Sequence, residues 1–190
     1  MAEIVTVRVH LDRLQGVIEQ NRNLLGEFKG LGKEQLNWKL RKGEWSVAQC
    51  LQHLIKINRS YFDTIEKKLY SASPPKDPKE KFNLSWKAKM AIKLNGPNPP
   101  FRIPTIKALK PSSITFDTDI VEQAEDLLKR ELQVLEASRS VDIKRTIIVS
   151  PFGKMIQLNL GEMLALIAWH DNRHLLQAYK LTRLPEFPKA

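Results

Sequence analysis

Two of the four histidines in this sequence, His170 and His174, stand four residues apart, a spacing that suits metal chelation. On an α-helix, side chains four positions apart share one face with their Cβ atoms about 5–6 Å apart, so both imidazoles can reach one ion. The stretch 161–181 repeats steps of three and four residues, which predicts a helix. Its seam also contains Met163, Ile167, Gln177 and Leu181.

A third candidate ligand, His53, lies in a second predicted helix. Its start is marked by Ser46 with Gln49 three residues later, a capping box. A histidine on an apolar face is often a core residue, so this third imidazole decides between a metal site and a structural pair. Three neutral imidazoles with one open position are typical of catalytic sites for Zn²⁺ or Ni²⁺. His10 has no partner at chelating spacing, and we expect it to be structural or exposed.

Other residues near these histidines could take part in chemistry. Asp171 and Glu44 are the candidates for a base or for a group that orients a ligand, although Asp171 directly follows His170 and can point away from a metal. The string HDNRH differs from the HExxH motif of zinc proteases, because aspartate is a methylene shorter than the glutamate that acts there as general base. For Cys50, one turn from His53, we expect a buried, inert thiol; a thiol near the metal is the alternative.

Apolar residues at helical spacing predict the elements that position these side chains. Long helices are expected over residues 3–28, 46–69, from 118 or 119 to before 140, and 161–181 with Asn159 and Glu162 as its cap. A shorter helix is expected over 84–94, and a turn or very short strand at 146–149. Leu36, Trp38 and Trp45 should fold back against the helices.

The stretch 95–115 contains five prolines, which exclude a helix or a central strand there. A long connection of this kind indicates a crossover that spans the length of a bundle. We therefore expect an all-α fold, a four-helix bundle with a long crossover connection. Residues 1–190 should form a single domain.

The formal net charge of +10 is concentrated in one segment. Between Lys76 and Lys110 there are nine basic and two acidic residues. A solvated connection is the simplest interpretation, and attraction of anionic substrates or nucleic acid is the alternative. No zinc-finger, helix-turn-helix or aromatic nucleic-acid motif accompanies this charge. No apolar run is long enough for a membrane span or a signal peptide, so we expect a cytoplasmic protein without membrane contact.

Two motifs, GEWSVAQCLQHL (43–54) and PFGKMIQLNLGEMLALIAWHDNRHLLQ (151–177), resemble the DinB-like superfamily of metal-binding four-helix bundles. The resemblance implies a site of His53, His170 and His174, with Gln177 matching the glutamine that often follows the last ligand. The familiar HHRGQ ending is RHLLQ here, which is closer to the subgroup with a single closing histidine.

Members of that superfamily include transferases and isomerases that use low-molecular-weight thiols, and proteins described as metal-dependent hydrolases; many form dimers. The resemblance thus implies a divalent-metal enzyme, a thiol transferase or hydrolase that acts on a small molecule, with Zn or Ni as the metal and a homodimer as the assembly. The alternatives are a metal-binding stress protein without catalysis and a basic nucleic-acid-binding protein.

Overall fold

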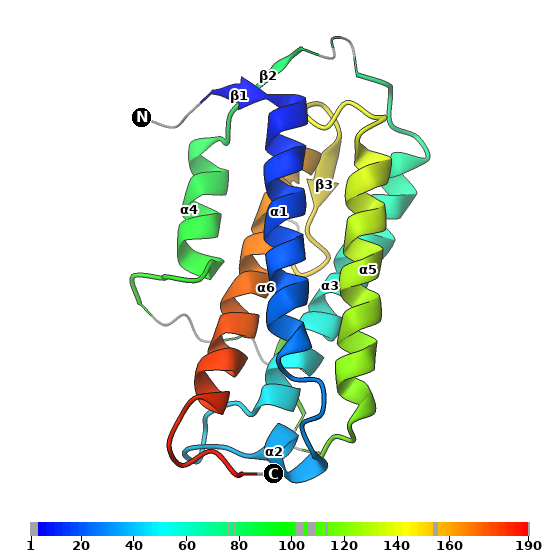
Figure 1. Ribbon diagram of the computed structural model, residues 1–190. Coiled ribbons are helices and arrows are strands. Elements are labelled where there is room, and N and C mark those ends of the chain that lie inside the picture. Colours follow the sequence, from blue (N-terminus) through cyan, green and yellow to red (C-terminus); the bar gives the residue numbers. More distant parts are fainter. Residues whose placement is uncertain are drawn as a thin grey trace.

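The computed structural model describes the chain except residues 1–3, 76, 78, 102–104, 106–108, 113, 154, 155 and 190. A bundle of four long helices dominates it (Figure 1), which confirms the predicted architecture. Helices α1 and α3 each pack against both α5 and α6. The four helices are α1 (Val7–Gly26), α3 (Val47–Leu69), α5 (Asp119–Ser138) and α6 (Leu160–Thr182).

The arrangement of the helices requires the long crossover that the prolines indicated. Helices α3 and α5 are neighbours that run in the same direction, so the chain must return along the bundle between them (Figure 1). The return passes through β2 (Lys81–Phe82) and α4 (Trp86–Asn95), and α4 packs against α6. The sequence predicted this short helix over 84–94. It begins later because the Ser85 hydroxyl caps it.

The first helix is shorter than the predicted 3–28, because α1 begins at Val7 and ends at Gly26. Val5–Thr6 form β1, which pairs antiparallel with β2. Thr6 then caps the helix with its hydroxyl. The predicted first turn of the helix is thus replaced by strand pairing with β2. Residue 3 lies outside the described residues.

Capping boxes fix the starts of the two helices that hold the histidines. Ser46 and Gln49 exchange side-chain and backbone hydrogen bonds at the start of α3, and Asn159 and Glu162 do the same at α6. Both boxes were predicted. They satisfy backbone N–H groups that have no partner inside the helix, so they define its first residue.

A β-hairpin leads directly into α6. Its strands, β3 (Ile147–Val149) and β4 (Gln157–Asn159), are antiparallel with Ile148 opposite Leu158. The very short strand expected near 146–149 is therefore present, and its partner was not foreseen. Both central residues are buried, and β3 packs against α3 and α6.

The polar connection between α1 and α3 folds back as expected. It contains the short helix α2 (Lys33–Asn37), whose Leu36 is fully buried. Trp38 and Trp45 are partly buried and pack against the core. Among the described residues, none of the helices is long and apolar enough to span a membrane.

Gly161, in the first turn of α6, is expected to resist any side chain. An added Cβ would lie 2.7–2.8 Å from atoms of Phe82 and Ile143. Overpacking of this kind costs about 1–3 kcal/mol, so Gly161→Ala should lower the free energy of unfolding measured in urea. Gly16 of α1 is the matched control, because nothing lies within 4 Å of its added Cβ and alanine there should stabilise the helix. Equal effects of the two substitutions would contradict this packing.

Candidate metal centre

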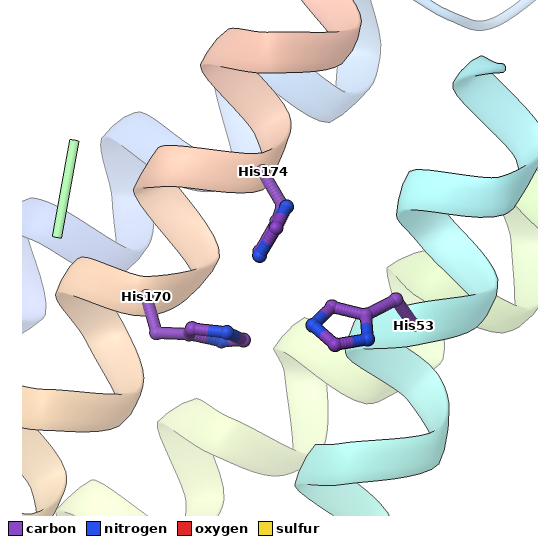
Figure 2. Close-up of side chains that lie close together, drawn as sticks. All are labelled: His53, His170 and His174. Atoms are coloured by element: carbon purple, nitrogen blue, oxygen red, sulfur yellow. The ribbon is translucent and has the colours of Figure 1, made fainter. Parts of the chain in front are cut away.

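Three histidines from two helices point toward one another inside the bundle (Figure 2). His53 comes from α3, and His170 and His174 come from neighbouring turns of α6. One ring nitrogen of each lies within 4.8 Å of the others. His53 and His174 are buried, and His170 is partly exposed. The structure thus brings together the three residues that the sequence suggested as ligands.

Hydrogen bonds orient two of the rings. His53 Nδ1 lies 2.8 Å from the Leu109 carbonyl oxygen, and His174 Nδ1 lies 3.1 Å from Gln177 Oε1. Both oxygens can only accept, so each Nδ1 carries the hydrogen and each Nε2 keeps its lone pair. Gln177, which the resemblance singled out, therefore acts on the triad through His174. A neutral imidazole with Nδ1–H bonded outward is the usual form of a metal-binding histidine.

Trp45 covers the triad from the connection before α3. Its ring stacks on His174 with centroids 5.4 Å apart and lies 4.7 Å from the ring of His53. The sequence predicted that Trp45 packs against the bundle, but nothing in the spacing indicated the histidines as its partners. Its indole restricts the access of water to these two imidazoles.

A cluster of buried polar residues, Asn58, Glu131 and Asp171, lies next to His170. Asp171 is fully buried, and its Oδ2 accepts a hydrogen bond of 2.6 Å from Asn58 Nδ2 of α3. Its other oxygen, Oδ1, is 3.7 Å from His170 Nδ1, slightly beyond hydrogen-bond range, and has no hydrogen-bond partner among the described residues. Glu131 of α5 also interacts with Asp171 through a side-chain hydrogen bond. Three helices thus meet at the Asp171 carboxylate.

The two acids of this cluster, Glu131 and Asp171, are both shifted toward the neutral form. Burial raises the pKa of Glu131 well above its ordinary value, and the neighbouring charge of Asp171 adds to the shift. Burial also raises the pKa of Asp171, while His170 and the hydrogen bonds from Asn58 and Glu131 oppose that shift. Both shifts disfavour two ionised carboxylates side by side in the interior. Sequence analysis missed Glu131 and Asn58, although an acid and an amide on apolar helix faces were the available signal.

The other candidate residues do not join the triad. Glu44 is partly exposed and is not among the residues that line the adjoining cavity. Cys50 is fully buried, and burial raises the pKa of its thiol to about 12, which agrees with the expected inert thiol. His10 was expected to be structural or exposed, and the structure shows it in a structural role. Its Nε2 lies 3.0 Å from the Gly161 carbonyl oxygen, and its ring stacks on Phe82.

A cavity of about 370 Å³ opens beside the triad. Its wall is largely apolar, and among the described residues no aspartate or glutamate lines it. Among the described residues that line the cavity, Arg173 carries a charge, and it donates a hydrogen bond to the Leu94 carbonyl oxygen. The remaining lining residues are Ile57, Asn58, Tyr61, Asn95, Thr105, Leu109, Ser150, Phe152, Ile156, Leu166 and Ile167.

The basic segment reaches this cavity through its uncharged residues. Asn95, Thr105 and Leu109 line the cavity, and Leu109 also bonds to His53. The described lysines of the segment are exposed, including those of α4. Lys76, Arg102 and Lys107 lie outside the described residues. The segment therefore flanks the site, with its described lysines directed to solvent.

Comparison with known proteins places the chain in a family. The model of the DinB superfamily matches residues 17–178. The chain belongs to the DinB superfamily. A Geobacillus kaustophilus (strain HTA426) protein named "Putative metal-dependent hydrolase GK0616" is 29% identical over 154 residues, which cover 81% of this chain and 73% of that protein.

A solved structure shares the fold of this DinB-superfamily chain. YfiT from Bacillus subtilis is described as "a probable metal-dependent hydrolase with an unusual four-helix bundle topology". It aligns with a TM-score of 0.55 and 18% identity over 91% of this chain and 86% of YfiT.

Burial of the triad should make the metal-free protein sensitive to acid. Burial and the neighbouring His170 lower the pKa of His53 to about 4, below its ordinary 6.5. Between these values the unfolded chain binds a proton that the folded chain does not, so the free energy of unfolding should fall as the pH is lowered from about 6.5 to 4. Urea unfolding of chelator-treated protein checks this. His53→Gln should show a shallower decline, and an equal slope in both proteins would contradict the assignment.

Proposed function

We propose that the chain is a metal-dependent enzyme of the hydrolase type that acts on a small molecule at His53, His170 and His174. The convergence of three imidazole nitrogens beside a cavity carries this proposal. Imidazole nitrogens suit Zn²⁺ and Ni²⁺, and three protein ligands leave a position for a reactant. The names of the related proteins from Geobacillus kaustophilus and Bacillus subtilis support the hydrolase class.

The residues of the chain would prepare the site for such an ion. The Leu109 carbonyl and Gln177 hold two imidazoles in the tautomer with a free Nε2, and burial keeps these rings neutral. Trp45 and the apolar wall exclude bulk water, which strengthens electrostatic interactions in the site. A divalent ion held there would supply Lewis-acid activation of a water or thiol at neutral pH.

A second candidate is thiol transfer, and the composition of the cavity wall favours it. Hydrolysis benefits from a general base, yet among the described residues no carboxylate lines the cavity. A thiol needs less help, because its ordinary pKa near 8.5 is far below that of water. A low-molecular-weight thiol would therefore suit this site as the nucleophile.

Two assays test the proposal and separate its two forms. Elemental analysis of the purified protein should find about one divalent ion per chain, and His53→Ala should lose it. The loaded protein is then screened against esters and amides, and against electrophiles with and without added thiols. Turnover that requires the thiol favours transfer, and turnover without thiol favours hydrolysis. Full metal content in His53→Ala, or metal without any turnover, would overturn the enzyme proposal and favour a stress protein that only holds metal.

Lysines of α4 are expected to assist anionic substrates rather than bind DNA. Lys87, Lys89 and Lys93 are exposed on the helix whose last residue, Asn95, lines the cavity. Charge reversal at all three should raise KM for an anionic substrate, more at low than at high salt, and should leave kcat and metal content unchanged. Steady-state kinetics check this expectation. Tight, sequence-independent DNA binding that disappears on reversal would instead favour the nucleic-acid alternative.

A further inference from the structure

The residues that line the cavity extend from the triad along both α3 and α6. His53, Ile57 and Tyr61 follow one another along α3 and all line it. Eight residues of helix rise about 12 Å, so Tyr61 is about 12 Å from His53 along the helix axis. The opposite wall comes from α6, where Leu166 and Ile167 precede His170. The cavity therefore runs along the groove between α3 and α6, away from the candidate metal ligands.

A pair of hydroxyl groups marks the far end. Tyr61 Oη and Ser150 Oγ are 3.0 Å apart, and both residues are more than 90% buried. Ser150 Oγ also accepts a hydrogen bond from the Phe152 backbone N–H, and the ring of Phe152 packs edge to face against Tyr61. The hairpin of β3 and β4 thus fixes the position of the pair.

This hydroxyl pair has a hydrogen-bond donor left over. Two O–H groups share one mutual hydrogen bond, and the Phe152 N–H takes an acceptor position, so one O–H remains. Among the described residues, no acceptor forms a hydrogen bond with this remaining O–H group. A donor without an acceptor in an apolar pocket carries a cost that a ligand oxygen would relieve. The pair is therefore suited to bind an acceptor group of a ligand.

The wall between the two ends is mostly apolar, and its polar exception is Asn58, whose Oδ1 has no hydrogen-bond partner among the described residues. Ile57, Leu166 and Ile167 are less than 10% exposed and contribute only aliphatic carbon. Asn58 also lines this part, and its amide nitrogen donates to Asp171. A ligand that reaches from the triad to the hydroxyl pair thus crosses an aliphatic surface.

We propose that the substrate is an elongated small molecule with its reacting group at the triad, an apolar acyl or aryl middle, and a hydrogen-bond acceptor held by Tyr61 and Ser150. This inference rests on the proposed function, because the triad defines the reacting end. Tyr61 and Ser150 are then residues that determine specificity. They lie too far from the triad to take part in bond cleavage.

Hydroxamates are suitable probes, because the hydroxamate group binds the metal and the rest of the molecule is free to vary. Calorimetry on the zinc-loaded protein compares acetohydroxamate, hexanohydroxamate and the six-carbon hydroxamate that ends in a primary amide. Affinity should rise with chain length by up to about fourfold for each methylene group buried. The terminal amide oxygen should add about a further fivefold over a chain of equal length.

The double variant Tyr61→Phe/Ser150→Ala should abolish the gain from the terminal amide and leave the affinity for hexanohydroxamate unchanged. Both residues are changed because either hydroxyl alone still offers a donor. Tyr179→Phe, a tyrosine outside the cavity lining, is the matched control and should keep the gain. Melting temperature and zinc content of each variant confirm that the fold and the metal centre persist.

The outcomes separate this inference from the function on which it rests. If acetohydroxamate binds but chain length and the terminal amide have no effect, the assigned substrate shape is wrong and the metal centre stands. If the amide gain persists in the double variant, the hydroxyl pair is not the subsite. If zinc fails to bind, the metal centre is refuted, and the orientation assigned to the substrate is refuted with it. If zinc binds but acetohydroxamate does not, the metal centre stands and the orientation alone is refuted.

Discussion

His174→Ala should remove bound metal and still give a cooperatively folded bundle. A structural zinc site with four ligands contributes about 10–16 kcal/mol, or about 3 kcal/mol for each ligand, so loss of one should weaken metal binding by on the order of 100-fold. The fold should persist because its core consists of large apolar side chains away from the triad, such as Phe28, Phe62 and Leu128. Elemental analysis and thermal unfolding of the same sample measure both effects.

His10→Ala is the matched control, with the opposite pattern. His10 is buried and contacts the Gly161 carbonyl oxygen and the ring of Phe82, so its loss should lower the melting temperature. It has no contact with the triad among the described residues, so metal content should stay at the wild-type level. His174→Ala should also melt at a lower temperature than the metal-loaded wild type, because bound metal stabilises the folded state. A His174→Ala chain that fails to fold, or that keeps its metal, would contradict the separation of site and fold.

Asp171→Ala is expected to destabilise the protein by about 3 kcal/mol. The substitution removes a charged acceptor from Asn58 and Glu131, and it leaves two polar groups without a partner in the interior. It also removes the carboxylate 3.7 Å from His170 Nδ1, which should weaken metal binding by about 10–100-fold. Urea unfolding of metal-free protein and metal titration measure the two effects separately.

Glu131→Gln provides the comparison for this cluster. Glutamine keeps the volume of the neutral acid and a donor for Asp171, so the free energy of unfolding should change by less than about 1 kcal/mol. Glu131→Leu removes the donor and should cost more in both stability and metal affinity. If glutamine is as damaging as leucine, then Glu131 is ionised in the folded protein and the description of the cluster is wrong.

The sequence was sufficient for much of the bundle and for the three histidines, because these depend on local patterns. Helical spacing and capping boxes are properties of short segments, and they located the starts of α3 and α6 correctly. The i, i+4 pair follows from the helix alone. His53 needed the resemblance as well as its position on an apolar face, since spacing alone does not show that α3 and α6 touch.

The remaining features depend on contacts between distant segments. The pairing of Val5 with Phe82 shortens α1, and no local signal marks it. The Leu109 carbonyl reaches His53 only because the crossover lies over the site. Glu131 was within reach of the sequence, because it interrupts the apolar stripe between Leu128 and Leu135. A buried acid needs a partner, and that partner, Asp171, becomes evident only when α5 and α6 are placed together.

The most direct test of the metal centre is a crystal structure of the zinc-loaded protein with the anomalous signal recorded at the zinc edge. We expect one zinc peak per chain, with Nε2 of His53, His170 and His174 each about 2.0–2.1 Å from it and a water or other small ligand at the open position. Asp171 Oδ1 should then lie within hydrogen-bond range of His170 Nδ1. A zinc peak elsewhere on the chain, or three imidazoles that remain well beyond about 2.3 Å from the ion, would contradict the assignment.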